Sequence, residues 1–189
     1  MLDSTPYIVP SRILLLSFTP FRDYDGVVHS GEAEFLVEPL DVKISVFIPV
    51  GEQAEKLSKL EGQYVDIDID PPYFEAFNVK NAWGPLITLE PPDSEVPAPR
   101  YRLVGLFKIF EPEWGIFECG NLRFPIQGWL ETQNGKAFFV RDALRIDLSD
   151  MKEWPRKPKP VKSAWVELRK VRFYSYVLED FRRVKVWKS

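Results

Sequence analysis

The sequence predicts a mainly all-β fold with one short helix in its first half. Hydrophobic residues make up 45% and aromatic residues 14% of the 189 residues, which is enough apolar side chain for a core. Seventeen prolines against ten glycines indicate many chain reversals, which suit short strands better than long helices. Between these reversals, most segments alternate apolar and polar residues with the period of two typical of half-buried strands.

The segment from residue 12 to residue 50 contains the first three expected strands. The run 12–21 is largely apolar, and a polar turn follows it. The run 31–39 has glutamates at alternate positions, and 42–50 repeats the alternation after a hairpin connection that contains Pro39. The residues expected to face the core from the second and third strands are Ala33, Phe35, Val37, Val42, Ile44, Val46 and Ile48.

The hydrophobic spacing changes to that of a helix at residues 51–62. Ala54, Leu57 and Leu60 recur at intervals of three, and polar residues fill the other positions. Gly62 is placed where a glycine commonly ends a helix. We therefore expect one short helix here, with Leu57 in the core.

A fourth strand is expected directly after this helix, because Val65, Ile67 and Ile69 alternate with three aspartates. Side chains two apart on a strand lie about 7 Å from each other, so one ion could bridge at most two of the carboxylates. The spacing also fails the EF-hand pattern, which needs a glycine and a later glutamate. We expect Asp66, Asp68 and Asp70 to form a solvated outer face and not a metal site.

The order of these elements resembles that of the OB-fold barrel. Residues 42–69 are similar to the third strand, helix and fourth strand of OB domains in the single-stranded-DNA-binding and replication-protein-A group, and the resemblance covers about residues 10–90. It implies an OB-like β-barrel over residues 7–90, with a commonly used binding loop between its first two strands.

The rest of the chain divides at two proline-rich stretches. Residues 91–99 contain four prolines and predict a linker, and a second small β unit is expected over 100–150, with turns near Gly120 and Gly135. Residues 151–189 begin with a basic, proline-rich linker and continue into a basic C-terminal segment, expected as a pair of strands. A helix remains an alternative for 163–183, because Trp165, Leu168, Val171 and Leu178 could line one of its faces.

Charge is distributed unevenly along the chain. Residues 151–189 hold 12 of the 25 Lys and Arg residues and 4 of the 28 Asp and Glu residues, a balance of +8. The first 150 residues hold the remaining 13 basic and 24 acidic residues, a balance of −11. A basic segment beside an acidic body favours contact with nucleic acid or another acidic surface. The alternative is that the segment docks on its own acidic body. Removal of residues 151–189 is expected to leave a folded body that has lost most of its affinity for nucleic acid.

Catalysis and cofactor binding find little support in the sequence. His29 and Cys119 are each the only residue of their type, which excludes zinc sites built on several such ligands. No glycine-rich phosphate-binding loop is present. The first residues lack a basic and then apolar leader, and the apolar runs are too short to span a bilayer, so we expect a cytoplasmic protein with no membrane contact.

The turn after the first strand is one candidate site for nucleic acid. Phe21, Arg22 and Tyr24 offer stacking surface and a cation near the loop that OB domains commonly use. The alternative is that these are ordinary loop aromatics that cover one end of the barrel.

The C-terminal segment is the stronger candidate. If 168–178 is a strand, basic and aromatic residues alternate with Val171, Phe173 and Val177, and one face combines phosphate neutralisation with base stacking. The alternative is a basic hairpin packed on the acidic body. The candidate contacts in this segment are Arg156, Lys157, Lys159, Lys162, Lys170, Arg172, Tyr174, Tyr176, Arg182, Arg183 and Lys185.

The sequence therefore predicts an accessory nucleic-acid-binding protein for single-stranded DNA or RNA, without enzymatic activity, metal or cofactor. Its acidic body is expected to contact a protein partner in a larger complex. The alternative is a non-catalytic protein-interaction or scaffold subunit.

Overall fold

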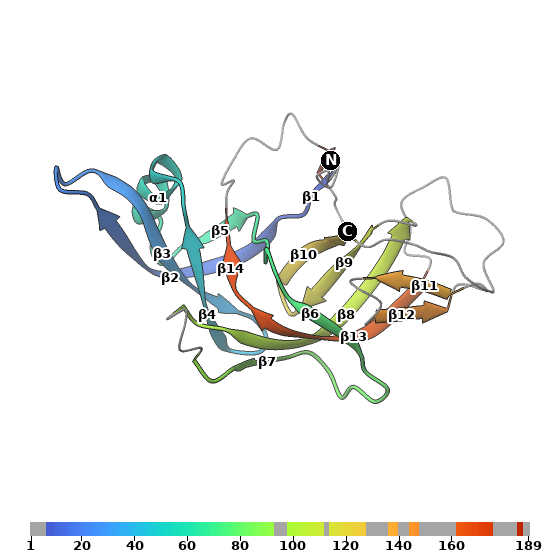
Figure 1. The fold of residues 1–189 in the computed structure, drawn as a ribbon. Coiled ribbons are helices and arrows are strands. Elements are labelled where there is room, and N and C mark those ends of the chain that lie inside the picture. The colour runs from blue at the N-terminus through green and yellow to red at the C-terminus, as the bar shows by residue number, and fades with distance from the viewer. Residues whose placement is uncertain are drawn as a thin grey trace.

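The structure of the chain, a computed structural model, is mostly β with one short helix. Its described residues are 7–92, 98–111, 114–127, 136–139, 144–147, 162–175 and 185–186. The fold class predicted from the sequence is confirmed, because two curved sheets hold most of these residues (Figure 1). No helix in the described part of the chain has the length and apolar character needed to cross a membrane.

The first sheet curls into a barrel-like shape. Its strands follow the order β14–β4–β3–β2–β5, with β14 parallel to β4 and all other neighbours antiparallel. Just beyond β5, Asp70 exchanges two backbone hydrogen bonds with Tyr174, at 2.8 and 3.3 Å, which joins the two ends of the sheet. The bounds are β2 (Ser11–Arg22), β3 (Val28–Val37), β4 (Val42–Ile48), β5 (Tyr64–Ile67) and β14 (Phe173–Tyr174).

The alternation in the sequence sets which side chains fill this barrel. Phe35 and Ile67 are fully buried and Ile44 is 1% exposed, while Val42 is half-buried and packs at the margin of the core. Burying an aliphatic or aromatic side chain of this size stabilises the fold by about 1.5–3 kcal/mol. The core predicted from the period of two is therefore confirmed.

The helix α1 (Gly51–Ser58) connects β4 to β5 and covers the barrel with Ala54 and Leu57. It ends earlier than the sequence predicts, because Lys59 donates its backbone N–H to Lys56 in a tighter last turn. Gly62 does not cap the helix. It lies in the following turn with φ +80°, a conformation that glycine adopts without strain, and donates to the Leu15 carbonyl at 2.7 Å.

The second sheet is built around β8 and β13. Its strands follow the order β10–β9–β8–β13–β6, and β7 pairs with the first part of β8, on the side that β9 occupies farther along. The bounds are β6 (Glu75–Asn78), β7 (Leu86–Leu89), β8 (Tyr101–Glu111), β9 (Trp114–Cys119), β10 (Leu122–Gln127) and β13 (Lys162–Val171).

Two further strand pairs lie outside these sheets. β11 (Lys136–Phe139) is antiparallel to β12 (Leu144–Asp147), and β1 (Tyr7–Ile8) is parallel to β15 (Lys185–Val186). The turn predicted at Gly135 lies outside the described residues.

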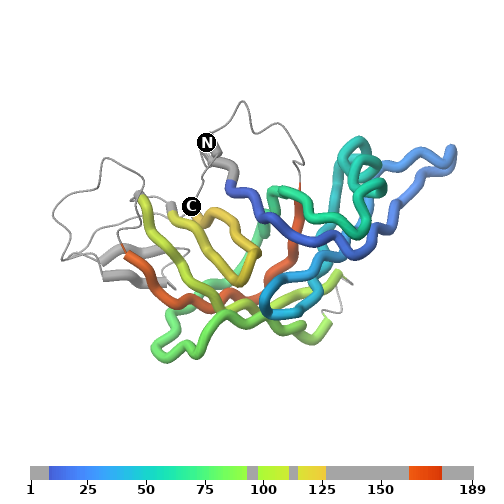
Figure 2. The backbone as a smooth tube through the Cα atoms, turned by 180° about the vertical axis from the view of Figure 1, so that it is seen from behind, coloured from blue at the N-terminus to red at the C-terminus, as the bar shows by residue number. Residues whose placement is uncertain are grey.

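The C-terminal segment belongs to the body of the protein. β13 lies between β8 and β6, with Val166, Leu168 and Val171 fully buried. The chain then enters the first sheet as β14, and in both views this red segment runs from one sheet to the other (Figure 1, Figure 2). The helical alternative is wrong for residues 162–174, and the expectation that the body folds without 151–189 is not supported.

The two sheets also meet at a turn. The β9–β10 turn lies on the β3–β4 connection, where Asn121 donates its backbone N–H to the Glu38 carbonyl at 2.8 Å. Ser11 of β2 donates its hydroxyl to the Arg123 carbonyl at 3.0 Å. A single cluster of buried side chains spans both sheets. The predicted division of the chain into units at residues 90 and 150 stays a prediction. The structure adds that residues 162–174 supply one strand to each of the two sheets.

Candidate functional site

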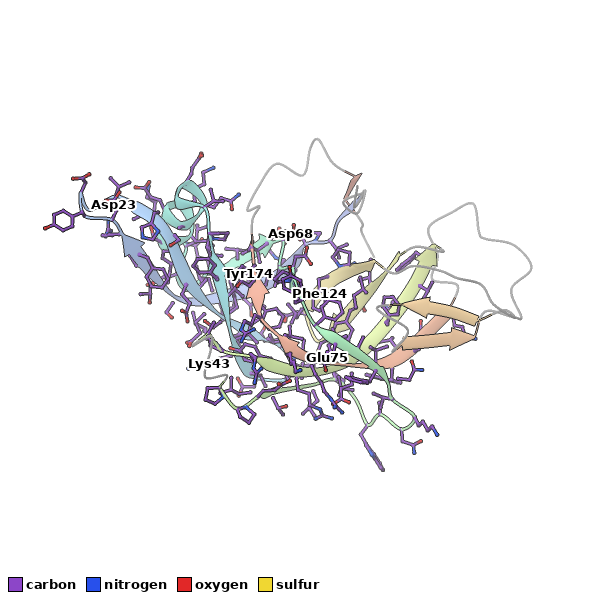
Figure 3. The ribbon with its side chains drawn as sticks, viewed as in Figure 1. Asp23, Lys43, Asp68, Glu75, Phe124 and Tyr174 are labelled. Carbon is purple, nitrogen blue, oxygen red and sulfur yellow. The ribbon has the colours of Figure 1, made fainter. Side chains whose placement is uncertain are left out.

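Three aromatic side chains lie together on the outer face of the first sheet. Phe21 of β2 and Phe47 of β4 have ring centroids 6.5 Å apart, and Phe47 meets Tyr174 of β14 edge-on at 5.6 Å. Phe21 is 37% exposed, and the other two rings are half-buried. We refer to Phe21, Phe47 and Tyr174 as the aromatic row. Figure 3 shows Tyr174 where β14 meets the first sheet.

Strand register explains how residues distant in sequence form this row. Along β4, Val46 and Ile48 point into the core, so Phe47 between them must point outward. Phe47 lies opposite Glu32 on one side and opposite Tyr174 on the other. The two rings are neighbours because β14 inserts into the sheet beside β4.

A cleft of about 230 Å³ adjoins the aromatic row. Two hydrogen bonds hold Ser45 in the wall of this cleft. The Ser45 backbone N–H donates to the Tyr101 hydroxyl at 2.8 Å, and the Ser45 hydroxyl donates to Glu32. Burial raises the pKa of Tyr101, so this hydroxyl stays protonated at neutral pH. The lining residues are Glu32, Ser45, Phe47, Ala98, Pro99, Arg172, Phe173 and Tyr174.

The three residues of the predicted site in the first turn do not lie together in the structure. Phe21 joins the aromatic row, whereas Arg22 donates to the Gly26 carbonyl at 2.9 Å and so holds the turn. Tyr24 is fully exposed at the tip of the hairpin (107%), beside Asp23, which Figure 3 shows at the outer end. Of the three predicted residues, Phe21 is the one that belongs to the aromatic row.

The predicted basic-aromatic face is partly present. Arg172 and Tyr174 alternate with the buried Val171 and Phe173, as expected of a strand, and both line the cleft. Lys170 does not join them, because it occupies a bulge with φ +58°, and its ammonium pairs with Glu75 at 2.7 Å.

Arg169 pairs with an acidic residue of its own segment, Glu167, and contacts the body through an aromatic ring. Glu167 accepts hydrogen bonds from both Arg102 and Arg169, and Arg169 lies over the Phe77 ring at 4.5 Å. Burial alone would raise the pKa of Glu167, but the two arginines lower it overall. Arg169 and Lys170 therefore pack on the body, as the alternative of a docked C-terminal segment predicts. Arg172 and Tyr174 instead line the cleft.

The remaining predicted contacts lie away from the cleft or outside the described residues. Lys162 is half-buried at the start of β13, and Lys185 lies in β15. The predicted contacts outside the described residues are Arg156, Lys157, Lys159, Tyr176, Arg182 and Arg183.

Sequence reasoning did not include Phe47 or Glu32 in the site. Phe47 is an apolar residue at an outward-facing position of β4, between Ser45 and the end of the strand, and this break in the alternation was a usable signal. The sequence shows Glu32 only as one of the glutamates that alternate along the run 31–39. Its position opposite Phe47 depends on strand register and could not be read from the sequence.

The described residues offer no metal centre, since none of their His, Cys, Asp and Glu side chains gather in threes around a possible ion. Burial raises the pKa of the Cys119 thiol to about 12, so this cysteine stays protonated and is a poor nucleophile. His29 is exposed on β3, with Nδ1 within 2.8 Å of the Ser30 hydroxyl.

The arrangement can hold a planar ring against partly exposed aromatic side chains, with a guanidinium and a carboxylate at its edge. No protein-family model matches the chain, and neither a curated protein nor a solved structure matches it.

Proposed function

We propose that this protein is an accessory nucleic-acid-binding protein that holds a single strand of DNA or RNA against the aromatic row. The observation that supports this most directly is the row itself: Phe21, Phe47 and Tyr174 lie side by side on an accessible face of an OB-like barrel. Single-strand binding proteins use such rings because every base has a face that can stack.

The charges near the row indicate that stacking contributes more to affinity than phosphate contacts do. Arg172 lines the cleft, but Glu32 lies in the same cleft, and Lys43 is 3.9 Å from Glu34. If one to three cations meet phosphates, the logarithm of the binding constant should fall with the logarithm of salt at a slope of about −0.7 to −2. Steeper dependence would indicate that cations beyond the cleft also take part.

The aromatic row is tested by removing one ring at a time. We expect Phe47→Ala and Tyr174→Ala each to weaken binding of a single-stranded oligonucleotide by about 1–3 kcal/mol. The salt slope should stay nearly unchanged, because stacking releases no counterions. Fluorescence anisotropy at several salt concentrations measures both quantities.

Tyr73→Ala is the matched control, because Tyr73 is 79% exposed and lies outside the aromatic row. This variant should bind like the unmodified chain. Thermal unfolding of each variant separates loss of binding from loss of fold. An unmodified chain that binds neither single-stranded DNA nor RNA at low salt would contradict the proposal.

The alternative function, a non-catalytic scaffold subunit, has its own supporting observation. Trp83 is fully exposed, and Leu86 and Leu89 are exposed on β7, which pairs only with β8 among the described strands. Exposed apolar side chains on an edge strand are typical of protein contact surfaces. Retention on heparin or single-stranded DNA at moderate salt distinguishes the two functions, because a scaffold subunit would not be retained.

A further inference from the structure

Glu32 places a carboxylate where a surface that bound only phosphates would carry cations. It lies on the outer face of β3, directly opposite Phe47, and lines the cleft together with Arg172. We infer that Glu32 selects the base: the cleft accepts bases that carry an exocyclic amine and disfavours uracil and thymine. This inference rests on the proposed function and adds the preferred substrate class.

A hydrogen bond from a neighbouring strand orients this carboxylate. Ser45 donates its hydroxyl to Glu32 Oε1, and Ser45 is itself fixed by the hydrogen bond between its backbone N–H and the Tyr101 hydroxyl. The Tyr101 ring is held in turn against Phe173, with centroids 5.4 Å apart. These contacts run from the buried Tyr101 and Phe173 through the half-buried Ser45 to the exposed Glu32, beside the Phe47 ring, where the edge of a stacked base would lie.

The chemistry of an ionised carboxylate gives the preference its direction. A carboxylate only accepts hydrogen bonds, and the 4-amino group of cytosine donates one. Uracil and thymine have a carbonyl oxygen at that position, so two acceptors would face each other and the carboxylate would receive no hydrogen bond from the 4-position of the base. Arg172, which only donates, lines the same cleft and suits the carbonyl oxygen and ring nitrogen of cytosine.

Cytosine and uracil provide the sharpest comparison, because the two rings differ at this edge and are alike in size. We expect the full-length chain to bind an oligo(rC) strand about fivefold to tenfold more tightly than an oligo(rU) strand of equal length. The measurement is fluorescence anisotropy at pH 7.5, where cytosine is unprotonated.

The decisive variant is Glu32→Gln. Its amide can donate to uracil and accept from cytosine, so the ratio of the two affinities should fall to about one while binding is kept. Glu34→Gln is the matched control, because Glu34 lies two residues along on the same outer face, carries the same charge and does not line the cleft. It should bind both strands slightly more tightly and keep the ratio.

The outcomes separate the two proposals. Equal binding of oligo(rC) and oligo(rU) by the unmodified chain would overturn the role of Glu32 and leave the proposed function standing. Loss of the preference in Glu34→Gln as well would also overturn it, because the effect would then come from net charge. Absence of binding to either strand would overturn the proposed function and this inference together.

Discussion

Asp68 and Asp70 hold their protons more tightly than an isolated aspartate does. Burial raises the pKa of both carboxyl groups to about 6, and the charge of Asp70 adds to the shift at Asp68. Asp66, two residues earlier, is exposed and pairs with Arg12 at 3.0 Å. The expected solvated face is therefore correct for Asp66 and Asp70, which are exposed, whereas Asp68 is half-buried close to the point where the barrel closes (Figure 3).

These two carboxyl groups predict that the fold is more stable in mildly acidic solution. The folded protein binds their protons more tightly than the unfolded chain does, so the free energy of unfolding should rise as pH falls from 7 through 6 toward 4. The double variant Asp68→Asn with Asp70→Asn should melt at a higher temperature than the unmodified chain at pH 7.5 and show a flatter pH dependence. Thermal unfolding at pH 5.5, 6.5 and 7.5 measures this.

Asp66→Asn is the control for this experiment, because Asp66 is exposed and already paired. It should keep the pH dependence of the unmodified chain. Glu167 does not interfere, since its pKa is lowered and its contribution is lost only below the ordinary carboxyl range. Identical melting curves for the double variant and the unmodified chain would show that Asp68 and Asp70 titrate normally.

The β9–β10 turn joins the two sheets through close backbone contact. Gly120 has φ +60°, and a Cβ atom at this position would lie 2.6 Å from the Glu38 carbonyl oxygen. Gly26, in the β2–β3 turn, has φ +80° but nothing within 4 Å of the corresponding position. The two glycines therefore share the backbone requirement and differ in packing.

Replacing each of these two glycines by alanine measures how much the contact between the β9–β10 turn and the β3–β4 connection contributes to stability. Gly26→Ala should lower the free energy of unfolding by about 1 kcal/mol, the cost of a left-handed conformation. Gly120→Ala should lower it by about 2–4 kcal/mol, because overpacking against Glu38 and Leu40 is added to that cost. Urea unfolding of both variants gives the difference. Equal losses of unfolding free energy in the two variants would mean that the β9–β10 turn can move away from the β3–β4 connection without penalty.

The segment that crosses between the sheets decides whether the chain folds as a whole. β13 and β14 bury Val166, Leu168, Val171 and Phe173. At about 1.5–3 kcal/mol for each buried side chain, their removal costs roughly 6–12 kcal/mol. A protein of this kind has a total stability of about 5–15 kcal/mol. The barrel and the second sheet therefore depend on the same short stretch.

Two truncations test this dependence. A chain that ends after residue 161 should lack a cooperative thermal transition, because both sheets lose a strand. A chain that ends after residue 175 keeps β13 and β14 and should retain one. Circular dichroism during heating distinguishes the two. A cooperative transition in the shorter chain would show that the acidic body folds alone, as the charge distribution suggested.

Alternation of apolar and polar residues was enough to predict the strands and most of the core. Phe35, Ile44 and Ile67 are buried where the period of two places them, because strand geometry sends successive side chains to opposite faces whatever the strand pairs with. The outward alternation of Arg172 and Tyr174 follows from the same local rule. Residue type alone also identified Phe21 and Tyr174 as candidates for stacking.

Pairing between distant strands was decided only by the tertiary structure. Phe47 and Tyr174 become neighbours because β14 inserts parallel to β4, and Glu32 reaches the cleft through the register of β3 on β4. The bulge at Lys170 directs its ammonium to Glu75 and away from the cleft. Such contacts are set by closure of the barrel and burial of a shared core. Their free energy depends on segments far apart in the chain, and no local window of sequence contains it.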